Sequence, residues 1–294
     1  MENVVELKNV TKNFKGFSIK NIDVQVKQGF VTGFIGANGA GKTSTIKMMM
    51  NLLKPDAGEV KLFGLDYRTH EKEIKERIGF VYDDNVFFEG LNLKDIKRIV
   101  GPAYKQWDDT LFYRYIEQFE LPLNKAVKTF SKGMQMKASL AIALSHHAEL
   151  IIMDEPTAGL DPIFRRELLD LLQELMIDGN RTIFFSSHIT TDLDRIADYI
   201  VFIQRGELVF NQSIHDVAEN YALVKGGIDL LDRDTEKAFI HVQRAATGFE
   251  ALTDNIKAVK SIFGDSVIIE QASLEDIMYY FYVLLKRGDT ACLI

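Results

Sequence analysis

The sequence predicts an α/β fold, because short apolar strands alternate with amphipathic helices over roughly the first 210 residues. The pattern then changes to short strands at 239–242 and 266–269 and a final helix from Leu274. We therefore expect an α/β domain over residues 1–211 and a small α+β extension, with an accessory or dimerisation role, over residues 212–294.

Composition limits the class of protein before any motif is considered. The 294 residues are 47% hydrophobic and carry a net charge of −7, so a sizeable core is available and non-specific nucleic-acid binding is disfavoured. The single cysteine, Cys292, allows no intrachain disulfide and suits a reducing compartment. Residues 1–10 do not resemble a signal peptide, and the apolar run 277–285 is too short to span a bilayer. We expect a soluble chain that reaches any membrane through a partner.

The elements of the first domain follow from residue spacing. Period-two alternation predicts half-buried strands at 4–10 and 22–26. Residues from about 91 to 148 are mostly helical by spacing, without a convincing strand. His146 and His147 end this stretch, and we expect them at the surface or at a helix cap rather than on a metal. Further strands are predicted at 30–35, 60–63, 78–82, 150–153, 182–185 and 199–203, and helices at 43–53, 165–176 and 190–197.

The stretch GANGAGKTS, residues 36–44, joins the apolar strand at 30–35 to a helix and matches the template G-x-x-x-x-G-K-[ST]. Its glycines allow the backbone N–H groups to approach phosphate oxygens at the N-terminus of the helix. Lys42 places a charge on the β- and γ-phosphates, and the Thr43 hydroxyl is a Mg²⁺ ligand. The predicted contacts of a nucleotide are Gly36, Asn38, Gly39, Ala40, Gly41, Lys42, Thr43 and Ser44.

Two further stretches carry candidate chemistry. The strand at 150–153 delivers Asp154 and Glu155 to its C-terminal end, where Asp154 can hold Mg²⁺ through water and Glu155 can polarise an attacking water. Ser131 is a natural N-cap for the following helix, and this small-residue start is a second possible anion site. A capped helix needs no ligand, however, so this stretch alone leaves both interpretations open.

The motifs GANGAGKT, FSKGM, IIMDEPTAGLD and SSHI occur in the order that is typical of the ATP-binding cassette (ABC) ATPases, and the sequence resembles that family over residues 1 to about 210. FSKGM stands in the place of the family's LSGGQ signature, immediately before the Walker B strand. Residues 158–161 resemble the D-loop, His188 resembles the switch histidine, and Phe14 resembles the aromatic residue that stacks on adenine.

The resemblance implies a P-loop NTPase core of RecA type, with an N-terminal antiparallel β-subdomain and an inserted helical subdomain at about 84–148. It implies ATP and Mg²⁺ as ligands, Glu155 as the catalytic base and His188 as the group that grips the γ-phosphate. Ser131 and Gly133 would contact ATP held by the P-loop of a second subunit. Asp161 would couple the two sites.

Two positions depart from the family pattern. Lys132 replaces the first glycine of the signature, a form that resembles single-domain bacterial drug and peptide exporters. Asp83 stands where the family has the glutamine or glutamate of the Q-loop. As a hard oxygen ligand it could coordinate Mg²⁺ directly or through water. Asp84 could substitute for it, and a solvated loop acid without a role remains an alternative.

The stretch Tyr104-Lys-Gln-Trp107-Asp108 resembles one found in exporter ATPases related to phenol-soluble-modulin and GntR-regulated transporters. Trp107 is either a packing anchor of the helical subdomain or a contact for a membrane partner. The whole resemblance implies an ABC exporter ATPase for a peptide or drug-like amphiphile. Its partners would be a second copy or a paralogous ATPase and a separate transmembrane permease, at the cytoplasmic face of the membrane.

Two other function classes compete with the exporter. A soluble ABC-type ATPase could act on ribosomes or nucleic acid, but repair members insert hundreds of residues between Walker A and signature, whereas Lys42 and Ser131 are 89 positions apart. Ribosome-acting members usually carry two cassettes, and this sequence has one. A nucleotide-gated module without turnover is disfavoured by the presence of both Glu155 and His188. We therefore expect no nucleic-acid partner.

Overall fold

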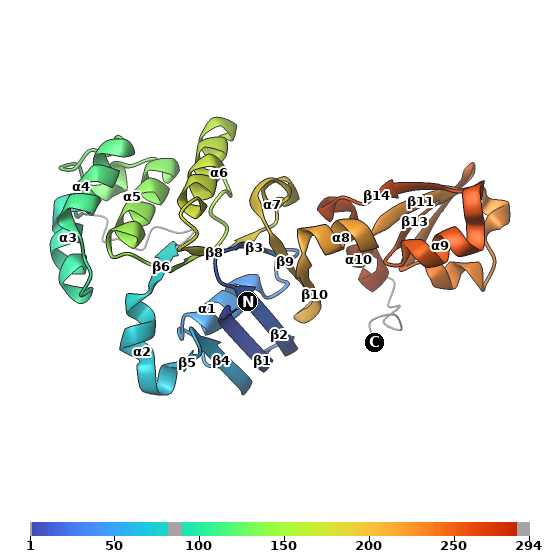
Figure 1. Cartoon of the computed structure of the whole chain (residues 1–294), viewed down its shortest axis with the longest axis horizontal. Coiled ribbons are helices and arrows are strands. Elements are labelled where there is room, and N and C mark those ends of the chain that lie inside the picture. The colour runs from blue at the N-terminus through green and yellow to red at the C-terminus, as the bar shows by residue number, and fades with distance from the viewer. Residues whose placement is uncertain (1, 82–89, 287–294) are drawn as a thin grey trace. The chain divides into compact units, whose positions relative to one another are not determined.

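The computed structural model describes residues 2–81 and 90–286, and the chain divides into two compact units between Leu208 and Val209 (Figure 1). This division lies inside strand β10 (Glu207–Ser213), as does the boundary at residue 211 expected from the sequence. The functional independence of the second unit stays a prediction. None of the helices in the described ranges is long and apolar enough to span a membrane.

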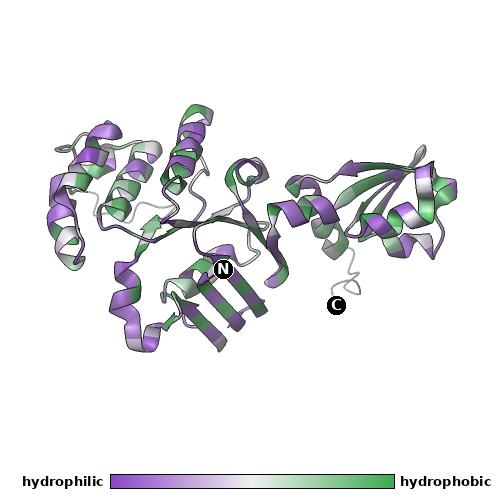
Figure 2. Cartoon of the chain, in the orientation of Figure 1, coloured by the Kyte–Doolittle hydropathy of each residue, from purple (hydrophilic) through white to green (hydrophobic). Residues whose placement is uncertain are grey.

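An antiparallel sheet with strand order β2-β1-β4-β5 opens the first unit. Its apolar side chains alternate with polar ones, so Val5 and Leu7 are buried while the strands show striped hydropathy (Figure 2). This sheet confirms the expected half-buried strands and the antiparallel subdomain. Its members are β1 (Asn3–Phe14), β2 (Phe17–Lys27), β4 (Ala57–Leu62) and β5 (Leu65–Asp66).

The second sheet has the order β10-β9-β3-β8-β7-β6, and the pairs from β9 to β6 are all parallel. Parallel strands deliver the loops at their carboxyl ends to one edge of the sheet. The P-loop follows β3, Glu155 follows β7 and His188 follows β8, so the order of the strands gathers the predicted site residues. The strands are β3 (Val31–Ile35), β6 (Ile78–Val81), β7 (Leu150–Met153), β8 (Thr182–Ser187) and β9 (Tyr199–Gln204).

Helix α1 (Lys42–Met49) packs between the two sheets. Its residues Ile46, Met48 and Met49 are buried in one hydrophobic cluster with apolar side chains from both sheets. Helices α6 (Pro162–Met176) and α7 (Thr190–Ile196) lie on the other side of the parallel sheet (Figure 1). Helix α2 (Tyr67–Glu76) precedes β6.

The inserted segment is helical, as expected. It contains α3 (Leu93–Val100), α4 (Asp109–Gln118) and α5 (Lys132–Ser145), and its β-structure within the described residues is one isolated bridge, Asn92 with Ala126. Trp107 lies against Gly101, where an added Cβ would be 3.2 Å from the indole, and its ring is 5.5 Å from that of Phe112. These contacts favour the packing-anchor interpretation of Trp107.

The second unit is an antiparallel sheet with the order β12-β13-β11-β14, which is the strand order of the split βαβ, ferredoxin-like arrangement. It has its own core around Val224, Phe249 and Phe263. Tyr280 donates a hydrogen bond to Glu250 across the other face of the sheet, at 2.9 Å. The elements are α8 (Ile214–Asn220), β11 (Ala222–Gly226), β12 (His241–Ala245), β13 (Gly248–Thr253), α9 (Ile256–Phe263), β14 (Ile268–Gln271) and α10 (Leu274–Lys286).

Candidate nucleotide site

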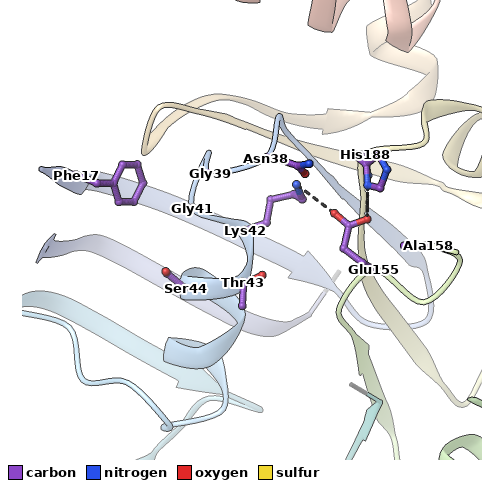
Figure 3. Close-up of a pocket in the computed structure, with 10 residues that line it drawn as sticks. All are labelled: Phe17, Asn38, Gly39, Gly41, Lys42, Thr43, Ser44, Glu155, Ala158 and His188. Atoms are coloured by element: carbon purple, nitrogen blue, oxygen red, sulfur yellow. Dashed lines mark hydrogen bonds and ion pairs between the residues drawn. The ribbon is translucent and has the colours of Figure 1, made fainter. Parts of the chain in front are cut away.

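A cavity of about 420 Å³ opens at the carboxyl edge of the parallel sheet, against the P-loop (Figure 3). Gly39 and Gly41 have φ angles of 79° and 114°, which side chains rarely adopt. At Gly36 a Cβ would lie 2.4 Å from the carbonyl oxygen of Ile203, so only glycine fits there. The residues that line the cavity are Phe17, Asn38, Gly39, Gly41, Lys42, Thr43, Ser44, Glu155, Ala158 and His188.

Lys42 is the cation of this cavity, and its side chain is only 6% exposed. Its Nζ donates a hydrogen bond to the carbonyl oxygen of Gly36 at 2.7 Å and lies 3.2 Å from Oε1 of Glu155. The lysine therefore bends back over its own loop and forms an ion pair with the carboxylate that follows β7 (Figure 3).

Glu155 connects Lys42 to His188. Its other carboxylate oxygen, Oε2, lies 2.7 Å from Nδ1 of His188 and also accepts a hydrogen bond from the backbone N–H of His188 at 3.2 Å. Ser186, fully buried in β8, donates to Oδ1 of Asp154 at 2.6 Å and accepts from the backbone N–H of Glu155 at 2.9 Å. The serine therefore fixes both acidic residues at the end of β7.

The predicted Mg²⁺ ligands can be compared with the structure in part. Thr43 lines the cavity, and Asp154 is 8% exposed at the end of β7. The described residues hold no group of three or more metal-ligating side chains. This donor set fits Mg²⁺, which commonly takes one or two protein oxygens and completes its shell with phosphates and water. Asp83 and Asp84 lie outside the described residues.

The aromatic residue that lines the cavity is Phe17, and the adenine contact expected of Phe14 stays a prediction. Phe17, at the start of β2, lines the cavity, whereas Phe14, at the end of β1, does not line it. The two rings stack with their centroids 6.0 Å apart, and Phe14 is 39% exposed. Both belong to one aromatic pair across the β1–β2 turn, and the sequence signal for Phe17 was its place in that hairpin.

Ala40 is buried within the loop, but Ser131, Gly133 and Asp161 do not line the cavity of their own chain. Ser131 caps α5 by accepting a hydrogen bond from the N–H of Met134 at 3.2 Å. Asp161 caps α6 by accepting from the N–H groups of Ile163 and Phe164.

The start of α5 packs directly on the start of α6. A Cβ on Gly133 would lie 2.8 Å from Cδ1 of Phe164, and the Nζ of Lys132 lies 3.5 Å from the place of a Cβ on Gly159. The signature and the D-loop are therefore adjacent within one chain.

Comparisons with known proteins agree with this geometry. A family model described as ABC transporter matches residues 19–158. The "Bacitracin transport ATP-binding protein BcrA" of Bacillus licheniformis is 37% identical over 214 residues, which are 71% of this chain and 69% of that protein. A solved "ATP binding subunit of ABC transporter" is 26% identical, with a TM-score of 0.67 over 74% of this chain and 92% of that one.

A second solved structure shares the fold, with a TM-score of 0.63 at 24% identity over 71% of this chain and 98% of that one. It is a dimeric post-hydrolysis state of the cassette MJ0796 with ADP and Pi. The level and coverage of these matches show that this chain belongs to the ATP-binding, ATP-hydrolysing subunits of the ABC transporter family.

Proposed function

We propose that this chain is the ATPase subunit of an ABC exporter that moves a peptide or a drug-like amphiphile through a separate membrane permease. The observation that carries the ATPase part of the proposal is the connected set Lys42, Glu155 and His188 at the mouth of a P-loop cavity. The relative from Bacillus licheniformis is named for transport of bacitracin, which supports a peptide-like substrate. The Tyr-x-x-Trp-Asp stretch supports the narrower phenol-soluble-modulin and GntR-regulated subset.

Hydrolysis is proposed to begin with an exchange of ionic partners. Lys42 pairs with Glu155 in this structure, and a triphosphate in the P-loop would draw Lys42 away from the carboxylate. Glu155 would then accept a proton from the attacking water, oriented by its contact with His188. Thr43 and Asp154 would hold Mg²⁺, which supplies charge stabilisation at the phosphates. Asp83 is proposed as a further ligand.

Two chains are proposed to share two ATP molecules head to tail. Ser131, Gly133 and Asp161 do not line the cavity of their own chain, so a second copy or a paralogue would bring its own signature to this P-loop. A dimeric state of the structural neighbour MJ0796 supports this arrangement. Phe14 and Phe17 would together receive the adenine ring.

The second unit is proposed as an accessory or dimerisation region, because it has its own core and no metal-ligating cluster among its described residues. The place of action is proposed to be the cytoplasmic face of the cell membrane, through the permease.

Mild purification from the native membrane, followed by identification of the proteins that accompany the chain, tests the exporter proposal. A polytopic membrane protein is the expected companion. Ribosomal proteins or nucleic acid in its place would instead support the soluble ABC class and overturn the exporter assignment.

A further inference from the structure

A partly buried ion pair joins the helix after the D-loop to the helix after the switch histidine. Arg165 lies in the first turn of α6, where its backbone N–H donates to the carbonyl of Asp161 at 2.9 Å. Asp192 lies in the first turn of α7, four residues after His188. Nε of Arg165 lies 2.6 Å from Oδ1 of Asp192, and Nη2 donates to the Thr191 hydroxyl at 2.9 Å.

This ion pair lies in an environment where it is expected to add little to the free energy of unfolding. The Asp192 side chain is 2% exposed, and its Oδ2 is buried without a hydrogen-bond partner among the described residues. Removing a carboxylate from water is expensive, and a buried pair with an unsatisfied oxygen often stabilises a fold no better than apolar residues of similar volume. Such a pair is better suited to fixing the position of one helix relative to the other.

We propose that Arg165 and Asp192 are positioning residues for ATP hydrolysis: they hold α7 against the start of α6 and so place His188 on Glu155. Both contacts of His188 with Glu155, from Nδ1 and from the backbone N–H, converge on one oxygen, Oε2. A shift of the first turn of α7 therefore changes both contacts together. The same pair connects this contact to Asp161, the cap of α6, so the D-loop and the switch histidine move as one piece.

The same two helices offer a matched control farther along. Nη2 of Arg195 in α7 lies 2.5 Å from Oδ1 of Asp170 in α6, but these side chains are 34% and 54% exposed. An exposed ion pair contributes little. Asp170→Asn therefore removes a bridge between α6 and α7 without touching the buried one.

The test is a double-mutant cycle with His188 in purified full-length protein. We expect Asp192→Asn to lower kcat for ATP hydrolysis roughly 10- to 100-fold with KM for ATP nearly unchanged, because it misplaces the histidine without touching the P-loop. In a His188→Ala background the same change should have an effect of less than about twofold. Asp170→Asn should leave kcat unchanged in both backgrounds.

A second readout does not depend on turnover. The imidazole NMR resonances of His188, assigned by their loss in His188→Ala, should shift in Asp192→Asn and stay in place in Asp170→Asn. Arg165→Lys keeps the charge at a partly exposed position, so it should shift the His188 resonances less than Asp192→Asn does and retain more ATPase activity. An Asp192→Asn variant with unshifted His188 resonances, or with the same fall in kcat in both backgrounds, would overturn the proposal. Neither result would bear on which compound is exported.

Discussion

Lys42 and Glu155 are ionic partners across the mouth of the P-loop cavity, with Nζ 3.2 Å from Oε1 and with side-chain exposures of 6% and 16%. Lys42 occupies Oε1 of Glu155 and His188 occupies Oε2, so the lysine pair must open before the proposed base can meet a water molecule. The triphosphate is the natural competitor for the lysine, because it carries more negative charge than one carboxylate. Nucleotide binding and activation of Glu155 are therefore expected to be coupled.

Glu155→Gln should separate binding from hydrolysis. The amide cannot take a proton from water, so kcat should fall by about 10²–10⁴, whereas ATP binding should persist. ATP should then hold the variant as a trapped dimer, detectable by light scattering after size exclusion. Glu149→Gln, at the opposite end of β7 and paired with Arg77, is the control and should hydrolyse ATP normally. A monomeric Glu155→Gln variant with normal turnover at saturating ATP would remove Glu155 from the role of base.

Phe17→Ala should weaken ATP binding more than Phe14→Ala does. Phe17 lines the cavity, while Phe14 reaches it only through the stacked pair. Loss of an aromatic platform under a base is worth about 1–3 kcal/mol, or roughly 5- to 150-fold in Kd. Fluorescence titration with a nucleotide analogue measures both values. A larger loss of nucleotide affinity in Phe14→Ala than in Phe17→Ala would show that Phe14, as indicated by the sequence motif, makes the main adenine contact.

Gly133→Ala should impair hydrolysis through packing. The new methyl group would meet Cδ1 of Phe164 at 2.8 Å, and such overpacking costs about 1–3 kcal/mol where the ring cannot move. We expect lower kcat with unchanged ATP binding by the isolated chain, because Gly133 does not line its own cavity. Gly133→Ala combined with Phe164→Leu should recover activity if the clash is the cause. A double variant as impaired as the single one would show that the glycine is needed for another reason.

The parts of the fold and of the site that depend on local sequence pattern could be predicted from the sequence. Uniform apolarity predicts β3 and β7, and the glycine spacing at 36–41 is enough to identify the phosphate loop. Helix α1 is shorter than the expected 43–53, because it ends at Met49 and Asn51 takes a φ of 55°.

Contacts between segments that are far apart in the chain could not be predicted from the sequence. Ser186 is an ordinary strand serine until β8 lies beside β7 and brings its hydroxyl to Asp154. Strands β10, β11 and β13 were also missed, because their short mixed sequences become strands only through pairing in the sheet. The expectation that His146 and His147 lie at a helix cap or at the surface is confirmed, because His146 is the buried C-cap of α5 and His147 is exposed.

His146 should make the stability of the helical subdomain sensitive to acid. Burial lowers the pKa of His146 to about 4, and its ring stacks on Tyr104 with centroids 3.9 Å apart. Below the ordinary pKa of 6.5, His146 is protonated in the unfolded chain but stays neutral in the folded chain. The contribution of His146 to the free energy of unfolding is therefore fully present above pH 6.5 and falls as the pH drops toward 4. The slope from this one group approaches about 1.4 kcal/mol per pH unit.

Substitution of His146 separates its contribution from that of other acid-sensitive groups. His146→Phe keeps an aromatic ring but cannot be protonated. Its urea midpoint should therefore fall less between pH 6.5 and 4 than that of the wild type. Unfolding is followed by the fluorescence of Trp107, the single tryptophan. The exposed His215, in the second unit, is the control, and His215→Gln should keep the wild-type slope. Parallel pH profiles of His146→Phe and the wild type would mean that His146 is not the source of the acid sensitivity.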